Sequence, residues 1–174
     1  MKNRIIEIEK LRRKCGLLTI VEDNNGLLKL SNRPSSRGCG LYWIYTSYTL
    51  EDLCNATISK NKNAIDIPFL AKSRKDLNNV IHPSEEGEFW IVYNGIGGRK
   101  PNSNHYYDLG ARILQEFRDN QKTGSLKVLG TNLSNLTKWR YSYVELDYSE
   151  YEIHKRDIET GWRLENGWPI LSKQ

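Results

Sequence analysis

Three segments of the chain have the pattern of apolar and polar positions that is typical of β-strands. They are residues 40–48, residues 89–93 and residues 137–147. In the first of them both faces carry aromatic rings, with Trp43 on one side and Tyr42 on the other. A half-buried strand does not require this, so the pattern raises the question of whether one of the tyrosine hydroxyls belongs to a site.

The residues before the first strand predict a helix and a hairpin. Residues 2–15 have the period of an amphipathic helix, with Ile5, Ile8 and Leu11 on one face. Two short apolar runs then flank Asn24-Asn25-Gly26, and an Asn-Gly pair between apolar runs favours a β-hairpin.

The segment between the first two strands, residues 49–86, has the character of an insertion. Its pattern predicts a helix that starts at residues 49–53, a polar break, and a second helix near residues 73–81. We therefore expect a helical insertion between the first two strands of the sheet.

Two further helices are expected around the third strand. Leu109, Ile113 and Phe117 recur at i, i+4 and i+8, which is a helical stripe, and Ser149 with Glu152 has the spacing of a capping box for the last helix. The order of elements is that of an α+β fold with a small central sheet. A length of 174 residues suits one domain, which we take as residues 1–174.

Charge and cysteine content narrow the classes of protein. The chain has 26 Lys and Arg against 21 Asp and Glu, a net charge of +5, which is compatible with a polyanionic partner but does not establish one. Its three cysteines lack C-x-x-C spacing, so we expect a reduced compartment without disulfides. Because no segment has the length of a membrane helix or the character of a signal peptide, we expect a cytoplasmic protein with no membrane partner.

Two short motifs and two charged residues then occur in an informative order. Gly40-Leu41-Tyr42 lies in the first strand, Tyr93-Asn94-Gly95 ends the second, and Arg112 and Glu159 lie on the helices that follow. This order resembles the GIY-YIG nuclease superfamily over roughly residues 38–174. The resemblance implies a three-stranded antiparallel sheet flanked by helices, with residues 1–37 as an N-terminal extension of helix and hairpin.

The sequence departs from the family pattern at particular positions. Asn94 stands where the second signature has an aliphatic residue, Glu116 where a tyrosine or histidine is common, and Ser172 where an asparagine is common. The long segment 49–86 between the two signatures is similar to the insertions of type II restriction enzymes on this fold.

The resemblance implies a DNA endonuclease, and the residue types suit that chemistry. Tyr93 would be the general base, Tyr42 would complete its hydrogen-bond network, and Arg112 would hold the scissile phosphate. Glu159 would bind Mg²⁺, with Mn²⁺ as a substitute and no small-molecule cofactor. Double-stranded DNA would be the partner, bound by a homodimer that cuts a short specific site.

Basic residues outside these helices are the expected DNA contacts. Arg99 and Lys100 follow the second signature, where they would lower the pKa of Tyr93 and contact DNA, and Lys100 is also a catalytic candidate. His105 would contact a phosphate or carry a proton. Further phosphate contacts are expected from one or more arginines of the N-terminal extension: Arg12, Arg13, Arg33 or Arg37.

Other interpretations of the same residues stay open. Arg112 has acidic neighbours at i−4 and i+4, and Glu159 has Lys155 and Arg163 at those spacings, so both residues also fit surface ion pairs. A non-catalytic nucleic-acid-binding module would use the aromatic and basic residues without Glu159. A metal-independent RNA-cleaving enzyme would instead use the 2′-hydroxyl of its substrate.

Overall fold

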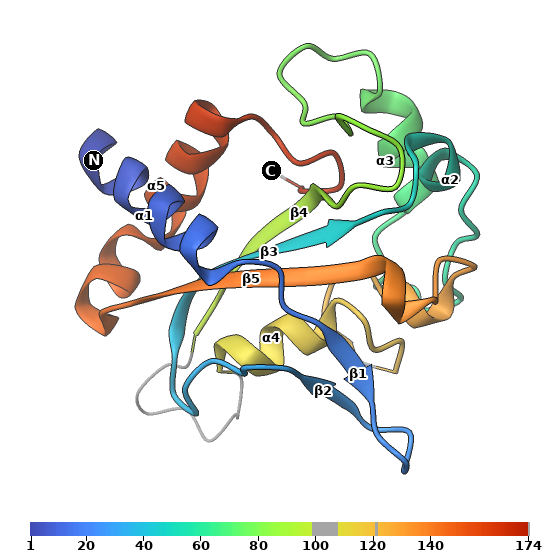
Figure 1. Cartoon of the computed structure of the whole chain (residues 1–174), viewed down its shortest axis with the longest axis horizontal. Coiled ribbons are helices and arrows are strands. Elements are labelled where there is room, and N and C mark those ends of the chain that lie inside the picture. The colour runs from blue at the N-terminus through green and yellow to red at the C-terminus, as the bar shows by residue number, and fades with distance from the viewer. Residues whose placement is uncertain (99–107, 121, 174) are drawn as a thin grey trace.

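The computed structural model describes residues 1–98, 108–120 and 122–173 of the chain (Figure 1). Its helices and strands, in chain order, are α1 (Lys2–Cys15), β1 (Ile20–Glu22), β2 (Leu28–Leu30), β3 (Cys39–Thr46), α2 (Leu50–Cys54), α3 (Ile67–Arg74), β4 (Trp90–Gly97), α4 (Leu109–Gln115), β5 (Trp139–Leu146) and α5 (Tyr148–Asn166). Two short 3-10 turns, Val128–Gly130 and Leu136–Lys138, lie between α4 and β5.

β3 is the central strand of an antiparallel sheet with the order β4-β3-β5, and β1 and β2 form a separate hairpin. In the register of this sheet, Tyr42 lies between Gly95 of β4 and Tyr143 of β5. The predicted α+β fold, with a three-stranded antiparallel sheet flanked by helices and an N-terminal helix and hairpin, is confirmed.

Two hydrophobic cores cover the two faces of the sheet, which explains the aromatic density of β3. Helices α1 and α5 lie on one face, where the core contains Leu41, Trp43 and Tyr45. Helix α4 lies on the other face, where the core contains Tyr42 and Ile44. Because both faces are covered, every residue of β3 is buried.

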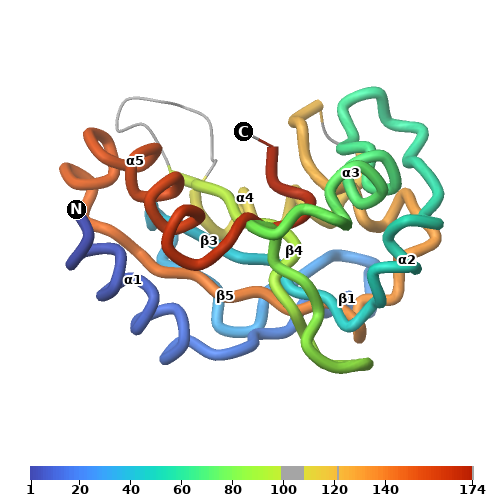
Figure 2. The backbone as a smooth tube through the Cα atoms, turned by 90° about the horizontal axis from the view of Figure 1, so that it is seen from above, coloured from blue at the N-terminus to red at the C-terminus, as the bar shows by residue number. Residues whose placement is uncertain are grey.

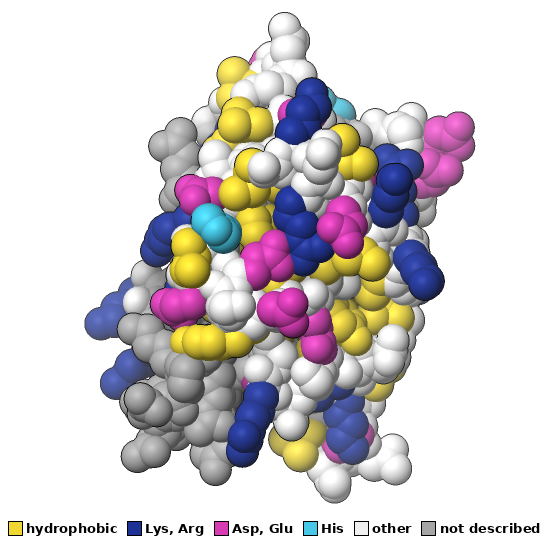
Figure 3. Space-filling model, turned by 90° about the vertical axis from the view of Figure 1, so that its left-hand side faces the viewer, with side chains coloured by type: hydrophobic (Ala, Val, Ile, Leu, Met, Phe, Trp, Pro, Cys, Tyr) yellow, Lys and Arg dark blue, Asp and Glu magenta, His cyan; other side chains and the backbone are white. Residues whose placement is uncertain are grey.

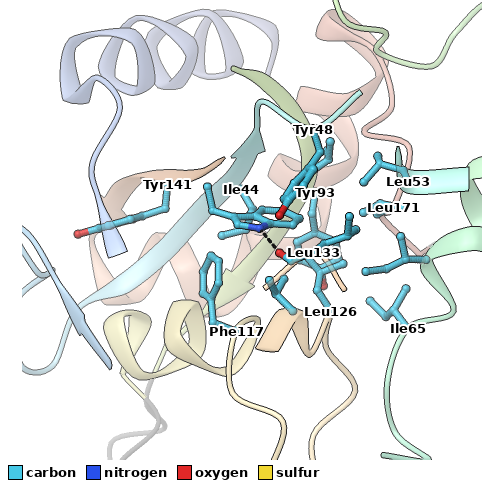
Figure 4. Close-up of a cluster of buried hydrophobic side chains, with 14 of the residues drawn as sticks. Ile44, Tyr48, Leu53, Ile65, Tyr93, Phe117, Leu126, Leu133, Tyr141 and Leu171 are labelled. Atoms are coloured by element: carbon cyan, nitrogen blue, oxygen red, sulfur yellow. Dashed lines mark hydrogen bonds between the residues drawn. The ribbon is translucent and has the colours of Figure 1, made fainter. Parts of the chain in front are cut away.

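The larger core extends from the sheet into the insertion and to the chain end (Figure 4). Leu53 and Ile65 of the insertion lie on the same side of it as Leu171. The indole N–H of Trp139 donates to the carbonyl oxygen of Leu133 at 2.8 Å, so this large ring is buried with its polar atom satisfied.

The C-terminal segment lies against β4 (Figure 2). The amide of Leu171 donates to the carbonyl oxygen of Val92 at 2.8 Å, and Arg74 at the end of α3 donates to the carbonyl oxygens of Ile170 and Ser172 at 3.0 and 2.6 Å. These bonds bring residues from the end of the chain beside the strand that carries the second signature.

The second helix of the insertion differs from its prediction. The prediction near residues 73–81 was wrong, because α3 spans Ile67–Arg74. Asp66 caps this helix by accepting from the amide of Phe69, and Pro68 lies in its first turn, where a missing N–H costs nothing. The first helix starts as predicted, with a capping box of Thr49 and Asp52.

Both terminal helices also differ in detail. The predicted capping box of Ser149 and Glu152 was wrong, because α5 begins at Tyr148 after Asp147 and has no side-chain cap. In α1, Ile5 and Ile8 are buried but Leu11 is exposed. The i, i+3, i+6 spacing drifts around the helix, so Arg12 at i+7 faces the sheet instead.

The inward position of Arg12 removes it from the expected DNA contacts. Its guanidinium donates to Glu9 and to the hydroxyl of Tyr45, and it lies 5.9 Å from the ring centres of Trp43 and Trp162. The expected phosphate contact of Arg12 was therefore wrong.

None of the helices in the described ranges has the length and apolar character needed to cross a membrane.

Candidate functional site

The two signature tyrosines meet on the α4 side of the sheet. Tyr42 on β3 and Tyr93 on β4 have ring centres 6.1 Å apart. Gly95 makes room for the first ring, because a Cβ on Gly95 would lie 2.5 Å from the hydroxyl oxygen of Tyr42. The strand predicted at residues 89–93 extends in the structure to Gly97, so the whole second signature, Tyr93-Asn94-Gly95, lies within β4.

Arg112 reaches the tyrosines from α4. The side chain of Asp108 caps this helix by accepting from the amide of Ala111 at 2.6 Å. A Cβ on Gly97 would lie 2.9 Å from the Cβ of Arg112, so the glycine lets α4 approach β4 closely. The guanidinium carbon of Arg112 lies 5.8 Å from the ring centre of Tyr42.

A fully buried carboxylate, Glu116, holds Arg112 and Tyr42 together. Its Oε1 pairs with Nη1 of Arg112 at 2.8 Å and accepts from the hydroxyl of Tyr42 at 2.6 Å. Its Oε2 accepts from the amide of Leu126 at 2.8 Å. A buried charge needs such partners, and removing one of them would leave an uncompensated charge in the core. The predicted i+4 pair of Arg112 exists, but it is buried and not a surface pair.

Tyr42 and Tyr93 are both held in the neutral form. Burial raises the pKa of Tyr42 well above its ordinary value, and Glu116 adds to the shift while Arg112 opposes it. Burial and then Glu116 also raise the pKa of Tyr93, against a lowering by Arg112. Arg99 and Lys100, the cations expected to lower the pKa of Tyr93, lie outside the described residues, so that expectation stays a prediction.

Glu159 approaches from α5, on the other side of the β4 edge. Its side chain is 15 % exposed and pairs with Nη2 of Arg163 at 2.8 Å. Burial raises its pKa, while Arg163, Arg156 and Arg112 lower it, so the charge of Arg112 acts on Glu159 from the opposite helix. Lys155 pairs with Glu152 at 3.0 Å and does not form the expected pair with Glu159.

The middle residue of the second signature belongs to a polar cluster beside Glu159. Asn94 is fully buried, and its Oδ1 accepts from Nε of Arg163 at 2.8 Å and from the hydroxyl of Ser172 at 2.9 Å. Two positions that depart from the family pattern, Asn94 and Ser172, are therefore in direct contact. Sequence reasoning missed this cluster, because its members lie far apart in the chain and no local spacing indicates the contact.

The candidate DNA-binding residues differ in their surroundings. Arg33 donates to both oxygens of Asp108, at 2.9 and 3.1 Å, so it also supports the start of α4. Arg37 is exposed in a loop that Glu145 holds in place by accepting from the amide of Ser35 at 2.6 Å. Arg99, Lys100 and His105 lie outside the described residues.

A pocket of about 200 Å³ opens beside Arg112. Its lining comes from the end of β4, from α4, from the segment after α4 and from α5: Ile96, Gly97, Gly98, Arg112, Gln115, Thr123 and Tyr151. A larger pocket of about 370 Å³ lies between residues 47–51 and 83–90, and its lining includes none of the predicted site residues.

The donor set that could hold a cation is small. Within the described ranges no three His, Cys, Asp or Glu side chains gather as a metal cluster. Among the same residues, Glu159 accepts a hydrogen bond at Oε1 alone, from Arg163. One carboxylate with a free oxygen fits Mg²⁺, which keeps several waters and takes few protein ligands in sites that also bind phosphate.

No family model, curated protein or solved structure matches the chain. The interpretation of the site therefore depends on its geometry.

Proposed function

We propose that the chain is a Mg²⁺-dependent endonuclease of the GIY-YIG kind that hydrolyses phosphodiester bonds of DNA. One observation carries the proposal: Tyr42, Tyr93 and Arg112 come from three elements and meet around the buried Glu116, and the charge of Glu159 on α5 acts on Tyr93. An ordinary core does not need an arginine, two tyrosine hydroxyls and a buried carboxylate in one place.

Arg112 is the proposed phosphate ligand. Its side chain is 19 % exposed, and Glu116 fixes the orientation of the guanidinium through Nη1. A planar guanidinium that is already oriented binds phosphate oxygens without a further loss of side-chain freedom. Its charge then offsets the negative charge that develops on the phosphate during hydrolysis.

Tyr93 is the proposed general base for the attacking water. Its raised pKa keeps the phenol protonated at neutral pH, so only a small fraction of the protein is in the active ionisation state. The hydroxyl of Tyr42 donates a hydrogen bond to Glu116, and Tyr42 also lowers the pKa of Tyr93, which favours the phenolate that a general base requires.

Glu159 is the proposed ligand of Mg²⁺. The bound ion would supply charge neutralisation at the phosphate and at the leaving oxygen. Burial raises the pKa of Glu159, and Arg163, Arg156 and Arg112 oppose that rise by favouring the ionised carboxylate that a hard cation requires.

Within this class we propose a type II restriction enzyme that acts on double-stranded DNA as a homodimer. The insertion between β3 and β4 offers elements for site recognition, and Arg37 offers an exposed charge for phosphate. Cutting both strands with one site per chain favours a two-fold dimer on a palindromic sequence.

Incubation of the protein with supercoiled plasmid, with Mg²⁺ or with EDTA, tests the proposal. Discrete linear fragments that form only with Mg²⁺ are expected. Binding without cleavage would favour a nucleic-acid-binding module, and cleavage of RNA in EDTA would favour the metal-independent alternative. Either result would overturn the proposed function.

A further inference from the structure

The guanidinium of Arg163 joins three parts of the molecule beside the proposed metal ligand. It lies on α5 with its side chain 6 % exposed. Nη2 binds Oε1 of Glu159 at 2.8 Å, and Nε binds Oδ1 of Asn94 on β4 at 2.8 Å. Nη1 donates to the carbonyl oxygen of Lys173 at 3.1 Å, and the ring centre of Trp168 lies 4.9 Å from the guanidinium carbon.

The side-chain amide of Asn94 directs its oxygen toward Arg163 and leaves its NH₂ group without a hydrogen-bond partner among the described residues. Its Oδ1 accepts from Arg163 and from Ser172, while its Nδ2 is buried without a hydrogen-bond partner among the described residues. The opposite orientation would turn the NH₂ group toward Arg163, which has donors and no acceptor, so the bond to Nε of Arg163 would be lost. The cluster therefore leaves one buried polar atom unsatisfied to keep Arg163 in position.

We infer that Arg163 is the positioning residue of Glu159, and that Asn94 and Ser172 anchor it. The inference rests on the proposed function. Arg163 occupies Oε1 of Glu159 and leaves Oε2 for a cation. The fork of the guanidinium binds Asn94 and Glu159 at the same time, which fixes the carboxylate relative to β4 and hence to Tyr93.

This inference gives one explanation for both departures from the GIY-YIG pattern. Asn94 stands where that pattern has an aliphatic residue, and its side chain supplies the acceptor for Arg163 from β4. Ser172 stands where that pattern often has an asparagine, and its hydroxyl binds Asn94 from the chain end. The backbone amide of Asn94 also donates to the Ser172 hydroxyl at 2.9 Å, which completes the link.

The test removes either the forked guanidinium of Arg163, while keeping its positive charge, or the side chain that anchors it. Arg163→Lys keeps a cation but cannot reach Asn94 and Glu159 together, and Asn94→Leu removes the anchor while Arg163 stays. Arg74→Lys is the matched control, because Arg74 binds the same chain end through Ile170 and Ser172 without contacting Glu159. Binding of Mn²⁺ alone to each protein is measured by electron paramagnetic resonance, and the Mg²⁺ concentration for half-maximal plasmid cleavage is measured beside it.

Arg163→Lys and Asn94→Leu should each weaken Mn²⁺ binding about 10–100-fold and raise the half-maximal Mg²⁺ concentration, whereas Arg74→Lys should change neither by more than about twofold. Glu159→Gln should abolish the binding in the same assay. Wild-type Mn²⁺ affinity in both variants, with loss in Glu159→Gln, would overturn the inference and leave the proposed function standing. Mn²⁺ binding that is insensitive to Glu159→Gln would overturn the metal assignment of the proposed function, and the inference with it.

Discussion

At the scale of single residues, the hydroxyl of Tyr93 is the most informative atom to remove. Tyr93→Phe should fold normally, because the ring stays in the core, but cleavage should fall about 10²–10⁴-fold as the general base is lost. Plasmid cleavage rates and melting temperatures of variant and wild type check this. Tyr148→Phe, at an exposed position, is the control and should cleave normally. Wild-type cleavage by Tyr93→Phe would return Tyr93 to a purely structural role.

The raised pKa of Tyr93 also predicts the pH dependence of cleavage. The phenol is protonated at neutral pH, so the fraction of phenolate, and with it the rate, should rise about tenfold per pH unit below that pKa. Single-turnover rates between pH 6 and pH 9 at saturating Mg²⁺ measure the slope. A rate that falls with pH over this range would exclude Tyr93 as the base.

The charge of Glu159 gives the second residue-scale prediction. Glu159→Gln keeps the size of the side chain but removes the charge, so cleavage should fall more than about 100-fold. DNA affinity should persist or increase, because an anion near the phosphate is gone. Cleavage rate, DNA affinity and melting temperature are measured side by side, with Glu152→Gln on the same helix as the control. Preserved cleavage in Glu159→Gln would contradict the metal assignment.

At the scale of elements, the docking of α1 depends on Glu9. Burial alone would raise its pKa, but hydrogen bonds from Arg12, Arg13 and Trp162 lower the pKa of Glu9 to about 2. A carboxylate with a lowered folded pKa contributes stability that is present above its unfolded pKa and is lost as pH falls through the folded pKa. The contribution of Glu9 should therefore disappear between pH 4.5 and about 2.

Glu9→Gln tests this contribution. Urea unfolding should show the variant to be less stable than wild type at pH 7, with the difference shrinking as pH falls toward 2.5. Glu7→Gln is the control, because Glu7 forms an exposed pair with Arg4 whose loss costs about 0–1 kcal/mol. A difference between Glu9→Gln and wild type that stays constant with pH would contradict the assignment.

At the scale of the whole molecule, one face of the protein carries basic and acidic side chains mixed together. Figure 3 views the side on which α1 and the start of α5 lie, and there Lys and Arg side chains are interspersed with Asp and Glu. Among the described residues on this face, such mixing gives no continuous basic surface.

The net charge of +5 nevertheless predicts salt-dependent binding. If about five phosphates are neutralised, the logarithm of the DNA association constant should fall with the logarithm of salt concentration at a slope of about −4.5. Fluorescence anisotropy with a labelled duplex between 50 and 200 mM salt measures this slope. Affinity that does not change over that range would remove the polyanionic partner from the proposal.

The sequence alone determined the elements of the sheet and most of the helices. The period of apolar side chains fixes which face of a strand or helix is buried, and Leu109 and Ile113 of α4 are fully buried as their spacing predicts. Phe117, the third residue of that stripe, is also fully buried, although α4 ends at Gln115. The predictions failed at helix boundaries, where one cap outweighs the period: Asp66 and Pro68 start α3 earlier than the apolar pattern indicates.

The sequence also indicated Tyr42, Tyr93, Arg112 and Glu159 as candidates, through the order of short motifs. Only the tertiary structure decided how they are supported. Glu116 joins Tyr42 to Arg112, and Asn94 joins Arg163 to Ser172, through contacts that form when strands and helices from distant parts of the chain pack together. The pKa of Tyr93 was likewise outside the reach of sequence, because it depends on burial and on the balance of charges across the packed core, and neither is a property of neighbouring residues in the chain.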